Sequence, residues 1–322
     1  MNRRFFLGGA AAAAVIANAE ALAQASSKTD SIEDKPASKE PPGKWQVQFP
    51  ELVMAAAPVE NSTGVSDRYA PFVAYLSREL GTKVSLRIVN DYAAIVEGQR
   101  SGNIHIAHYG PSSYARAWLV TNGGVEVFAT FLAADGSQGL YPVLFVRSDS
   151  PYKAIADLKG KNLCLVDPNS TTGNDGPRFS MDKLGINPEE FFTRVVYAGS
   201  HENALIAVRQ GTCDGAYSWW SSEQDSMALR MAKQGVLRAD EFRIIERADI
   251  IPTPPFAVLT SLPEGLKAAI RKAFLDAQEK DGAAVNRLWG GQYVGFKAAT
   301  QQDYQSSIEL LRFVDRLRRR HT

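Results

Sequence analysis

The sequence predicts an α/β fold of two lobes with mixed sheets, joined by two crossover strands. Strand-like and helix-like segments alternate from about residue 45, which is typical of parallel strands connected by helices. After residue 124 the alternation gives way to two successive strand-like runs, and a second alternating series begins at residue 162. Extended segments at 142–150 and 246–258 separate the two series, so we expect them to carry the chain between the lobes.

Length and composition fit a globular protein with two domains of ordinary size. The chain has 322 residues, of which 45% are hydrophobic and 22% are charged. Its formal net charge is +1, so no strongly basic surface indicates binding to nucleic acid. We expect a monomer that needs no cofactor, and local motifs must indicate what it binds.

The first 23 residues have the pattern of an export signal. Arg3 and Arg4 precede a modest apolar run, which ends in the small-residue sequence ALA at 21–23. The paired arginines resemble a twin-arginine signal, and an ordinary secretory signal is the alternative. Either signal predicts cleavage and a periplasmic mature protein. Residues 24–46 are polar and rich in Pro, Ser, Lys and Glu, which predicts a disordered leader.

Residues 47–146 together with 252–322 are predicted to form lobe one. Apolar residues at three-and-four spacing mark its helices, and β-branched residues in alternation mark its strands. We expect strands within 47–58, 83–89 and 104–110, and helices within 66–80, 91–102, 111–122, 264–278 and 300–317.

Residues 147–251 are predicted to form lobe two. We expect strands within 162–167, 194–199 and 213–220, and helices within 178–185 and 201–211. Cys164 and Cys213 lie in apolar runs of this lobe. Because buried free cysteine is common, we expect two core thiols, and a disulfide is the alternative.

A hydroxyl-rich junction stands out in lobe two, in the segment DPNSTTGNDGP at 167–177. Ser170, Thr171 and Thr172 follow a predicted strand and precede a predicted helix. A helix N-terminus presents unpaired N–H groups and a positive dipole end, and hydroxyl groups add further donors. Capping of the helix would explain one hydroxyl residue. Three in succession favour an anion site.

Two other junctions have the same character. In HYGPSSY at 108–114, Ser112 and Ser113 lie in the first turn of a predicted helix. His201 lies where the predicted strand at 194–199 ends and a predicted helix begins. It could bind the ligand, and the alternative is that it caps the helix or packs in the core. Because ligands bind at the carboxyl ends of strands in open α/β sheets, these junctions are expected to line a cleft between the lobes.

Catalysis and metal binding are weakly supported alternatives. Ser170, His201 and Asp214 supply the residue types of a catalytic triad, but the chain has no G-x-S-x-G elbow. His105 and His108 are three apart in a predicted strand, which places them on opposite faces. We therefore expect neither an enzyme nor a metal site.

Four segments resemble, in the same order, motifs of the PhnD family of phosphonate-binding proteins of ABC importers. The resemblance covers roughly residues 48–290, and its motifs are DYAAIVEGQRSGNIHIAHYGPSSYARA, DPNSTTGNDGP, AGSHENALIAVRQGTCDGAYS and IPTPPFAV. It implies a periplasmic binding protein-like fold. It also implies that the protein captures phosphonate, phosphite or a phosphate ester and delivers it to an inner-membrane permease.

The resemblance also implies the binding residues. Ser170, Thr171, Thr172 and His201 match positions that hold the phosphonyl group, and Tyr92 of the DYA motif matches a residue that closes on the ligand from lobe one. The remaining candidates, from YGPSSY and from aromatic positions near the motifs, are Tyr109, Ser112, Ser113, Tyr141, Trp219 and Trp220. The match at Tyr141 is offset by one, because Leu140 occupies the nominal position. Trp219 and Trp220 are either pocket walls or core aromatics.

The chain departs from the family pattern where aminophosphonate binders hold the ligand amine. Pro254 replaces a carboxylate there, and Trp219 and Trp220 lie near the other acidic position, with Glu223 slightly later. Because an ammonium group without a partner is costly to bury, we expect a small or apolar phosphonate, phosphite or a phosphate ester as the ligand.

The alternative function is presentation of an oxyanion to a membrane histidine kinase, as some PhnD-like proteins do. One such branch binds arsenite through a cysteine. Cys164 and Cys213 lie in strand-like stretches and not in the motif turns, which argues against that ligand.

Overall fold

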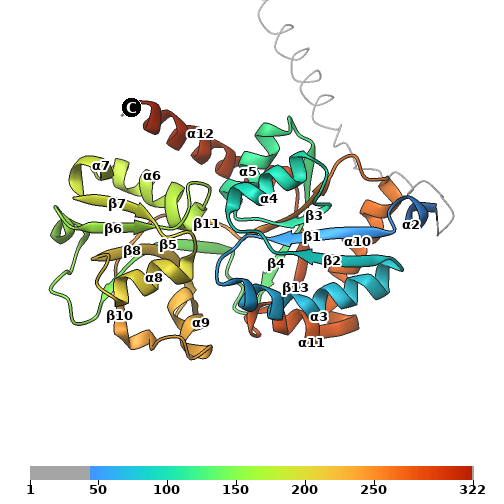
Figure 1. Cartoon of the computed structure of the whole chain (residues 1–322), viewed down its shortest axis with the longest axis horizontal. Helices are drawn as coiled ribbons and strands as arrows, with labels where there is room; N and C mark the ends of the chain where they lie inside the picture. Colours follow the sequence, from blue (N-terminus) through green and yellow to red (C-terminus); the bar gives the residue numbers. More distant parts are fainter. Residues whose placement is uncertain (1–43, 321–322) are drawn as a thin grey trace, which may run out of the picture. The chain divides into compact units, whose positions relative to one another are not determined.

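The computed structural model describes residues 44–320, which form two mixed sheets with helices packed against them (Figure 1). The first sheet has the order β13-β4-β12-β3-β1-β2, and its strands are β1 (Glu51–Ala56), β2 (Lys83–Arg87), β3 (Ile106–His108), β4 (Val125–Ala133), β12 (Pro255–Leu259) and β13 (Tyr293–Ala298). We call this sheet and its helices lobe one. The predicted α/β fold with mixed sheets is confirmed.

The second sheet, which defines lobe two, has the order β10-β5-β8-β6-β7, with β11 beside β5 and β9 beside β8. Its strands are β5 (Gly139–Arg147), β6 (Asn162–Leu165), β7 (Arg194–Tyr197), β8 (Gly215–Ser222), β9 (Asp225–Ser226), β10 (Phe242–Arg247) and β11 (Ile251–Pro252). In each lobe one strand runs parallel to two neighbours, β1 to β2 and β3, and β6 to β7 and β8. The carboxyl ends of these strands therefore share one edge of their sheet.

Helices follow the strands in both lobes. Lobe one has α2 (Lys44–Gln48), α3 (Ser62–Leu80), α4 (Tyr92–Arg100), α5 (Pro111–Val120), α10 (Glu264–Leu275) and α11 (Ala277–Trp289). Lobe two has α6 (Gly176–Lys183), α7 (Pro188–Phe191), α8 (His201–Arg209) and α9 (Met227–Lys233). Short turns are η1 (Ile155–Leu158), η2 (Thr171–Asp175), η3 (Ala239–Glu241) and η4 (Gln301–Tyr304), and α12 (Gln305–Arg320) ends the described chain. Within residues 44–320 no helix is long and apolar enough to cross a membrane.

Strand β5 shows how lobe two builds its core. Val143 and Phe145 pack in one buried cluster, and Leu144 and Val146 pack in another. Because successive side chains of a strand point to opposite faces, these clusters lie on the two sides of the sheet. This matches a sheet covered by helices on both faces.

The chain first passes from lobe one to lobe two at an earlier residue than the sequence predicted. The chain passes from β4 to β5 through 134–138, and it returns from β11 to β12 through 253–254. The predicted boundary at residues 146/147 is therefore too late, because β5 pairs with β8 and β10 inside lobe two. The return falls inside the predicted segment 246–258.

The predicted leader 24–46 ends too late as well. Residues from Lys44 onward form α2, and Trp45 is buried in the core of lobe one. The large apolar surface of this tryptophan stabilises the start of α2 against lobe one. The predicted signal at 1–23 and the rest of the leader lie outside the described residues.

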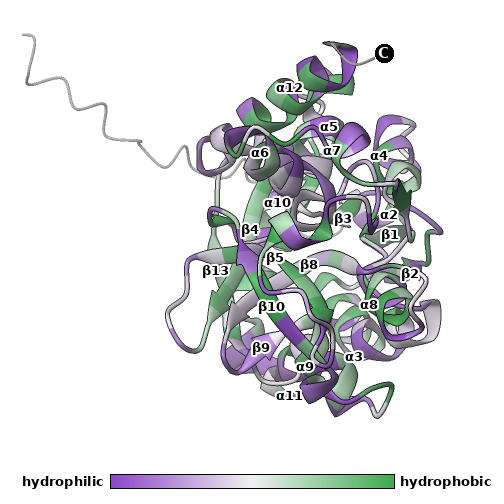
Figure 2. Ribbon diagram, turned by 90° about the vertical axis from the view of Figure 1, so that its left-hand side faces the viewer, coloured by the Kyte–Doolittle hydropathy of each residue, from purple (hydrophilic) through white to green (hydrophobic). Residues whose placement is uncertain are grey.

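Helix α12 contacts helices of both lobes, although it was predicted to belong to lobe one. It contacts α5 of lobe one and α6 of lobe two. Arg116 of α5 makes a bidentate ion pair with Asp315 at 2.7 and 2.8 Å, and Phe179 of α6 stacks edge-on against Phe313. Figure 2 shows both hydrophobic and hydrophilic colouring along α12, as expected of a helix with one buried face.

Cys164 and Cys213 form a disulfide, so the expectation of two core thiols is wrong. Cys164 lies in β6 and Cys213 lies just before β8, and their Cα atoms are 5.9 Å apart. Strands β6 and β8 are neighbours, which brings the two cysteines together. The sequence pattern alone does not show that adjacency. A disulfide fits the oxidising compartment that an exported protein reaches.

Reduction of this disulfide is expected to destabilise the protein. The bond closes a sequence separation of 49 residues, and restraint of the unfolded chain over such a loop contributes about 2–4 kcal/mol. We therefore expect the double variant Cys164→Ala/Cys213→Ala to lose that amount of unfolding free energy in urea titrations. The untreated wild-type protein should show no reactive thiol after denaturation. Two reactive thiols in that sample would contradict the disulfide.

Candidate functional site

A cavity of about 40 Å³ lies where residues beyond the strand ends of both lobes meet. Lobe one contributes Ala57 and Val59 after β1 and His108 at the end of β3, and lobe two contributes residues that follow β6 and β7. The predicted location of the site, at the carboxyl ends of the parallel strands, is the location of this cavity.

Four helical segments begin at the cavity wall. Tyr92 is the first residue of α4, Pro111 of α5, Thr171 of η2 and His201 of α8, and all four line the cavity. The first turn of a helix has N–H groups without intrahelical partners and carries the positive end of the helix dipole. The four segments therefore place positive potential at the cavity without a charged side chain.

The hydroxyl segment forms a π-helical turn and not a plain α-helical start. Ser170 is the N-cap of η2, and its side chain accepts a hydrogen bond from the N–H of Gly173 at 3.1 Å. The N–H of Asp175 donates to the carbonyl of Ser170 at 3.0 Å, which closes the wider turn. A Cβ atom at Gly173 would lie 2.3 Å from Val166, so only glycine fits. Helix α6 continues from this turn, two residues before its predicted start.

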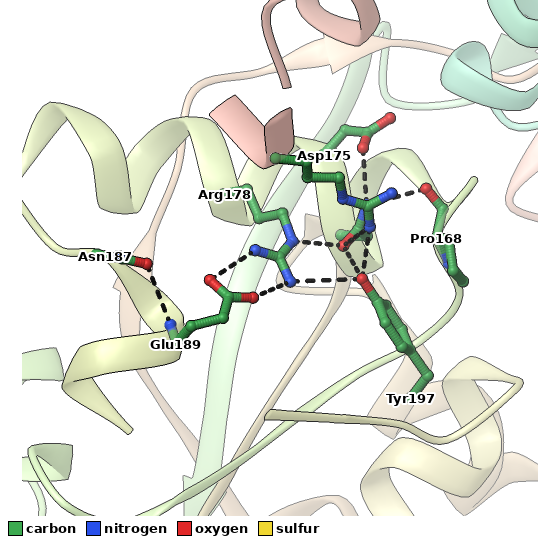
Figure 3. Close-up of polar contacts among 8 residues, drawn as sticks. Pro168, Asp175, Arg178, Asn187, Glu189 and Tyr197 are labelled. Carbon is green, nitrogen blue, oxygen red and sulfur yellow. Dashed lines mark hydrogen bonds and ion pairs between the residues drawn. The ribbon is translucent and has the colours of Figure 1, made fainter. Parts of the chain in front are cut away.

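A polar network holds this turn from behind. The buried Asn174 donates from Nδ2 to the carbonyl of Pro168 at 3.0 Å and to Asp175 at 2.7 Å. Its Oδ1 accepts hydrogen bonds from Arg178 at 2.9 Å and from Tyr197 at 3.0 Å. Figure 3 shows these contacts, which fix the turn against its own helix and against β7.

The same network reaches α7 and α12. Arg178 pairs with both carboxylate oxygens of Glu189 at 2.7 and 3.2 Å, as Figure 3 shows. Arg318 of α12 donates to the hydroxyl of Tyr197 at 2.5 Å. The hydroxyl turn is thus supported by elements that are far apart in the sequence.

Asp175, at the end of this turn, has a shifted pKa. Burial raises the pKa of Asp175 to about 7, although the hydroxyl of Ser112 and the charge of Arg318 lower it.

His201 faces the hydroxyl turn as a neutral ring. Its Nδ1 pairs with the hydroxyl of Ser218 at 2.9 Å, and its Nε2 lies 3.5 Å from Ser170 Oγ and 3.4 Å from Thr172 Oγ1. The last two distances are longer than an ordinary hydrogen bond, so Nε2 retains capacity for a ligand. Burial lowers the pKa of His201 to about 3, and the charge of Arg230 lowers it further.

Tyr92 and Tyr109 also line the cavity, in agreement with their selection from the sequence. The hydroxyl of Tyr92 hydrogen-bonds the side chain of Ser170, and burial raises the pKa of Tyr92 above its usual range. The hydroxyl of Tyr109 instead donates to the carbonyl of Ile95 at 3.3 Å, so only its ring is available to the cavity.

The two serines of YGPSSY have other roles. The backbone N–H of Ser112 donates to Thr171 Oγ1 at 2.8 Å and so joins the start of α5 to the hydroxyl turn of lobe two. Ser113 Oγ donates to the carbonyl of Gly110 at 2.9 Å, within its own helix start. Neither side chain lines the cavity.

Strand alternation decides which aromatic candidates reach the cavity. Leu140 and Trp219 line it, whereas their chain neighbours Tyr141 and Trp220 do not. Tyr141 and Trp220 are paired across β5 and β8, and their ring centroids are 5.7 Å apart. Arg247 stacks over both of them. The residue at the cavity is therefore Leu140, which occupies the nominal position of the family pattern, and not its neighbour Tyr141.

Several cavity residues were not among the sequence candidates. His108, Phe131, Ile251, Pro254, Trp289 and Tyr293 complete the wall together with the residues above and Gly110. His108 directly precedes the YGPSSY motif, so its position at a strand end was a usable signal. Trp289 and Tyr293 come from α11 and β13, where no motif singled them out. Among the described residues, no Asp, Glu, Lys or Arg lines the cavity.

The residues named as triad and metal candidates have other partners in the described part of the chain. Asp214 accepts hydrogen bonds from Tyr152 and Asn162, while His201 Nδ1 pairs with Ser218. His105 Nδ1 accepts from the N–H of Val53 at 2.9 Å, away from His108. Within residues 44–320 no three His, Cys, Asp or Glu side chains are grouped to hold a metal ion.

Sequence relatives match this chain over most of its length. The family model described as the periplasmic substrate-binding protein of phosphonate ABC transporters matches residues 54–304. The chain is 31% identical over 239 residues to the phosphonates-binding periplasmic protein of Escherichia coli K12, which covers 73% of this chain and 68% of the relative. It is 28% identical over 256 residues to the phosphate-import protein PhnD of Mycolicibacterium smegmatis, which covers 77% of each.

Solved structures show the same fold. The binding-protein component of an ABC phosphonate transporter from Pseudomonas aeruginosa superposes with a TM-score of 0.74 at 25% identity, covering 83% of this chain and 87% of the other. PhnD1 from Prochlorococcus marinus, solved with methylphosphonate, gives a TM-score of 0.73 at 19% identity, covering 82% and 98%. The chain belongs to the family of periplasmic substrate-binding proteins of phosphonate ABC transporters, which are binding proteins and not enzymes.

Proposed function

We propose that this protein captures a phosphonate or a related phosphorus oxyanion in the cavity between its lobes and delivers it to an inner-membrane ABC permease. The convergence of four helix starts on a cavity without charged side chains carries the proposal. Two sequence relatives are named for phosphate and for phosphonates, and one solved structure of similar fold holds methylphosphonate. The protein would act as a monomer after removal of its export signal.

The donors in the cavity suit a head group with several oxygens. Hydroxyl groups of Ser170, Thr171 and Thr172 and the ring of His201 lie on the lobe two side, beside the N–H groups of the π-helical turn. A phosphonyl group has three acceptor oxygens and carries between one and two negative charges. Neutral donors fixed at helix ends stabilise such a charge without a salt bridge.

The other walls favour a small substituent without positive charge. Pro254 and Trp219 lie at or near the positions where aminophosphonate binders carry acidic residues, Leu140 lies where the family carries an aromatic residue, and all three line the cavity. The cavity volume of about 40 Å³ exceeds the space that one water molecule needs, and it has room only for a ligand with few heavy atoms. The walls therefore support phosphite, methylphosphonate, phosphate or a compact ester.

Contacts across the cavity support capture by closure of the lobes. Thr171 of lobe two accepts from the N–H of Ser112 of lobe one, and Glu202 accepts from the backbone and side chain of Asn61 at 2.7–3.1 Å. A ligand that touches both lobes favours the closed arrangement over an open one, because its contacts form only there. The permease would then recognise the closed form.

The hydroxyl turn is tested by the double variant Ser170→Ala/Thr172→Ala. A hydrogen bond to a charged group contributes about 1.5–3 kcal/mol, so the loss of two should weaken binding by at least about 100-fold. Isothermal titration calorimetry with methylphosphonate, phosphite and phosphate measures the effect. We expect the variant to remain folded.

Ser226→Ala is the matched control for this experiment. Ser226 is also a buried N-cap, and it accepts from the N–H of Leu229 at 3.2 Å, but it does not line the cavity. We expect it to lower the melting temperature while leaving affinity unchanged. If the double variant binds as tightly as wild type, the hydroxyl turn is not the anion site.

The cavity wall predicts discrimination against cationic substituents. We expect 2-aminoethylphosphonate to bind at least about ten-fold more weakly than ethylphosphonate, because its ammonium group would be buried without a carboxylate partner. Competition calorimetry against the tightest small ligand measures the ratio. Tighter binding of 2-aminoethylphosphonate would show that the ligand amine finds a partner outside this wall.

A further inference from the structure

His108 and Trp289 both line the cavity, both have a buried ring nitrogen without a partner among the described residues, and neither is used by the proposed binding of the head group; of the two, His108 is the ring that ends a parallel strand. It ends β3 in lobe one, it is 3% exposed, and it lines the cavity. Its Nε2 is buried and has no hydrogen-bond partner among the described residues. A buried polar atom without a partner is costly, which points to a partner that is supplied by the ligand.

The imidazole ring is held in one position by its neighbours. It stacks on Phe256 with 4.6 Å between ring centroids, and the edges of Phe131 and Trp289 close around it at 5.4 and 5.6 Å. Its Nδ1 pairs with the hydroxyl of Tyr69 at 2.7 Å. Nε2 is then the one polar atom of the ring that is available to a group in the cavity.

The partners of Tyr69 decide which ring nitrogen of His108 carries the proton. Arg68, which is held by an ion pair with Glu60, also hydrogen-bonds the hydroxyl of Tyr69. Arginine only donates, so the Tyr69 oxygen accepts from Arg68 and its own proton is free to go to His108 Nδ1. Burial and the charges of Arg68 and Arg230 lower the pKa of His108 to about 3. In that arrangement the neutral ring carries its proton on Nε2 and is a donor.

His108 and His201 approach the cavity from opposite lobes with the same arrangement. Each ring has its Nδ1 paired with a hydroxyl group, Tyr69 for His108 and Ser218 for His201. His201 lies beside the hydroxyl turn, where the three oxygens of a phosphonyl head are proposed to bind. His108 belongs to the other lobe and lines the same cavity. It is therefore placed to contact the fourth group on phosphorus.

We propose that His108 donates a hydrogen bond from Nε2 to the fourth substituent of the bound phosphorus, and that the protein thereby favours ligands with an oxygen at that position. This inference rests on the proposed function. Phosphate and compact phosphate monoesters supply such an oxygen, whereas methylphosphonate presents a methyl group and phosphite a hydrogen. With either of the last two, the donor would remain buried without an acceptor.

The test compares three ligands by calorimetry at one pH. Phosphate and methylphosphonate differ little in size, so their affinity ratio reports the fourth group, and phosphite controls for size. We expect wild type to prefer phosphate by about ten-fold or more, which is the range expected for one unsatisfied buried donor. His108→Phe keeps an aromatic ring in the stack and should bring the ratio close to one, mainly through weaker binding of phosphate.

Two further variants separate a ligand contact from a structural role. Tyr109→Phe is the matched control, because Tyr109 lines the cavity but its hydroxyl donates to Ile95, so the ratio should stay as in wild type. Tyr69→Phe keeps His108 but removes the partner that fixes its proton, and it should give an intermediate ratio. This variant also serves if His108→Phe does not fold.

Specific results would overturn the inference. A wild-type protein that prefers methylphosphonate to phosphate contradicts it directly. A ratio unchanged in both His108→Phe and Tyr69→Phe, with only the melting temperature lowered, would make the histidine structural. If wild type binds none of the three ligands, the proposed function itself fails, and that result is distinguishable from a wrong role for His108.

Discussion

Stabilisation of a negative charge by neutral donors is the constraint that the proposed function places on this structure. Among the described residues, no cation lines the cavity, so any anion there must be stabilised by helix N-termini, hydroxyl groups and two neutral histidines. Such donors are effective only when they are fixed and shielded from water. The parallel strands meet this requirement, because each delivers its following helix to the same edge of the sheet. The arrangement of both lobes follows from that need.

The support of the hydroxyl turn is as demanding as the turn itself. A π-helical turn is rare, and it is supported here because Gly173 packs against Val166 and the side chain of Asn174 has all its hydrogen bonds satisfied. The partners of Asn174 come from β7, α6 and the distant helix α12. Helix α12 also pairs with α5 of lobe one through Asp315. The end of the chain thus links the anion-facing turn to both lobes.

Features that depend on local sequence patterns were predictable from the sequence. Features that depend on how distant segments pair or pack in the fold were not. The strand–helix alternation and the hydroxyl junction are local patterns, so the two sheets and the turn at Ser170 were predictable. The choice between Leu140 and Tyr141 depends on strand register, because adjacent residues face opposite sides. The disulfide needs the adjacency of β6 and β8, which no local pattern gives. Trp289 and Tyr293 reach the cavity only through the packing of α11 and β13.

The two sides of the cavity are built by separate parts of the chain, and this separation bears on specificity. The head-group side is one continuous segment together with His201, and its geometry depends on the network around Asn174. The rest of the wall combines single residues from β3, β5, the 253–254 crossing and β8, namely His108, Leu140, Pro254 and Trp219. Under the proposed function, substitutions of these residues would change the fourth group that fits without disturbing the hydroxyl turn. A binding protein of this design can therefore keep its recognition of the oxyanion while its preference among substituents changes one residue at a time.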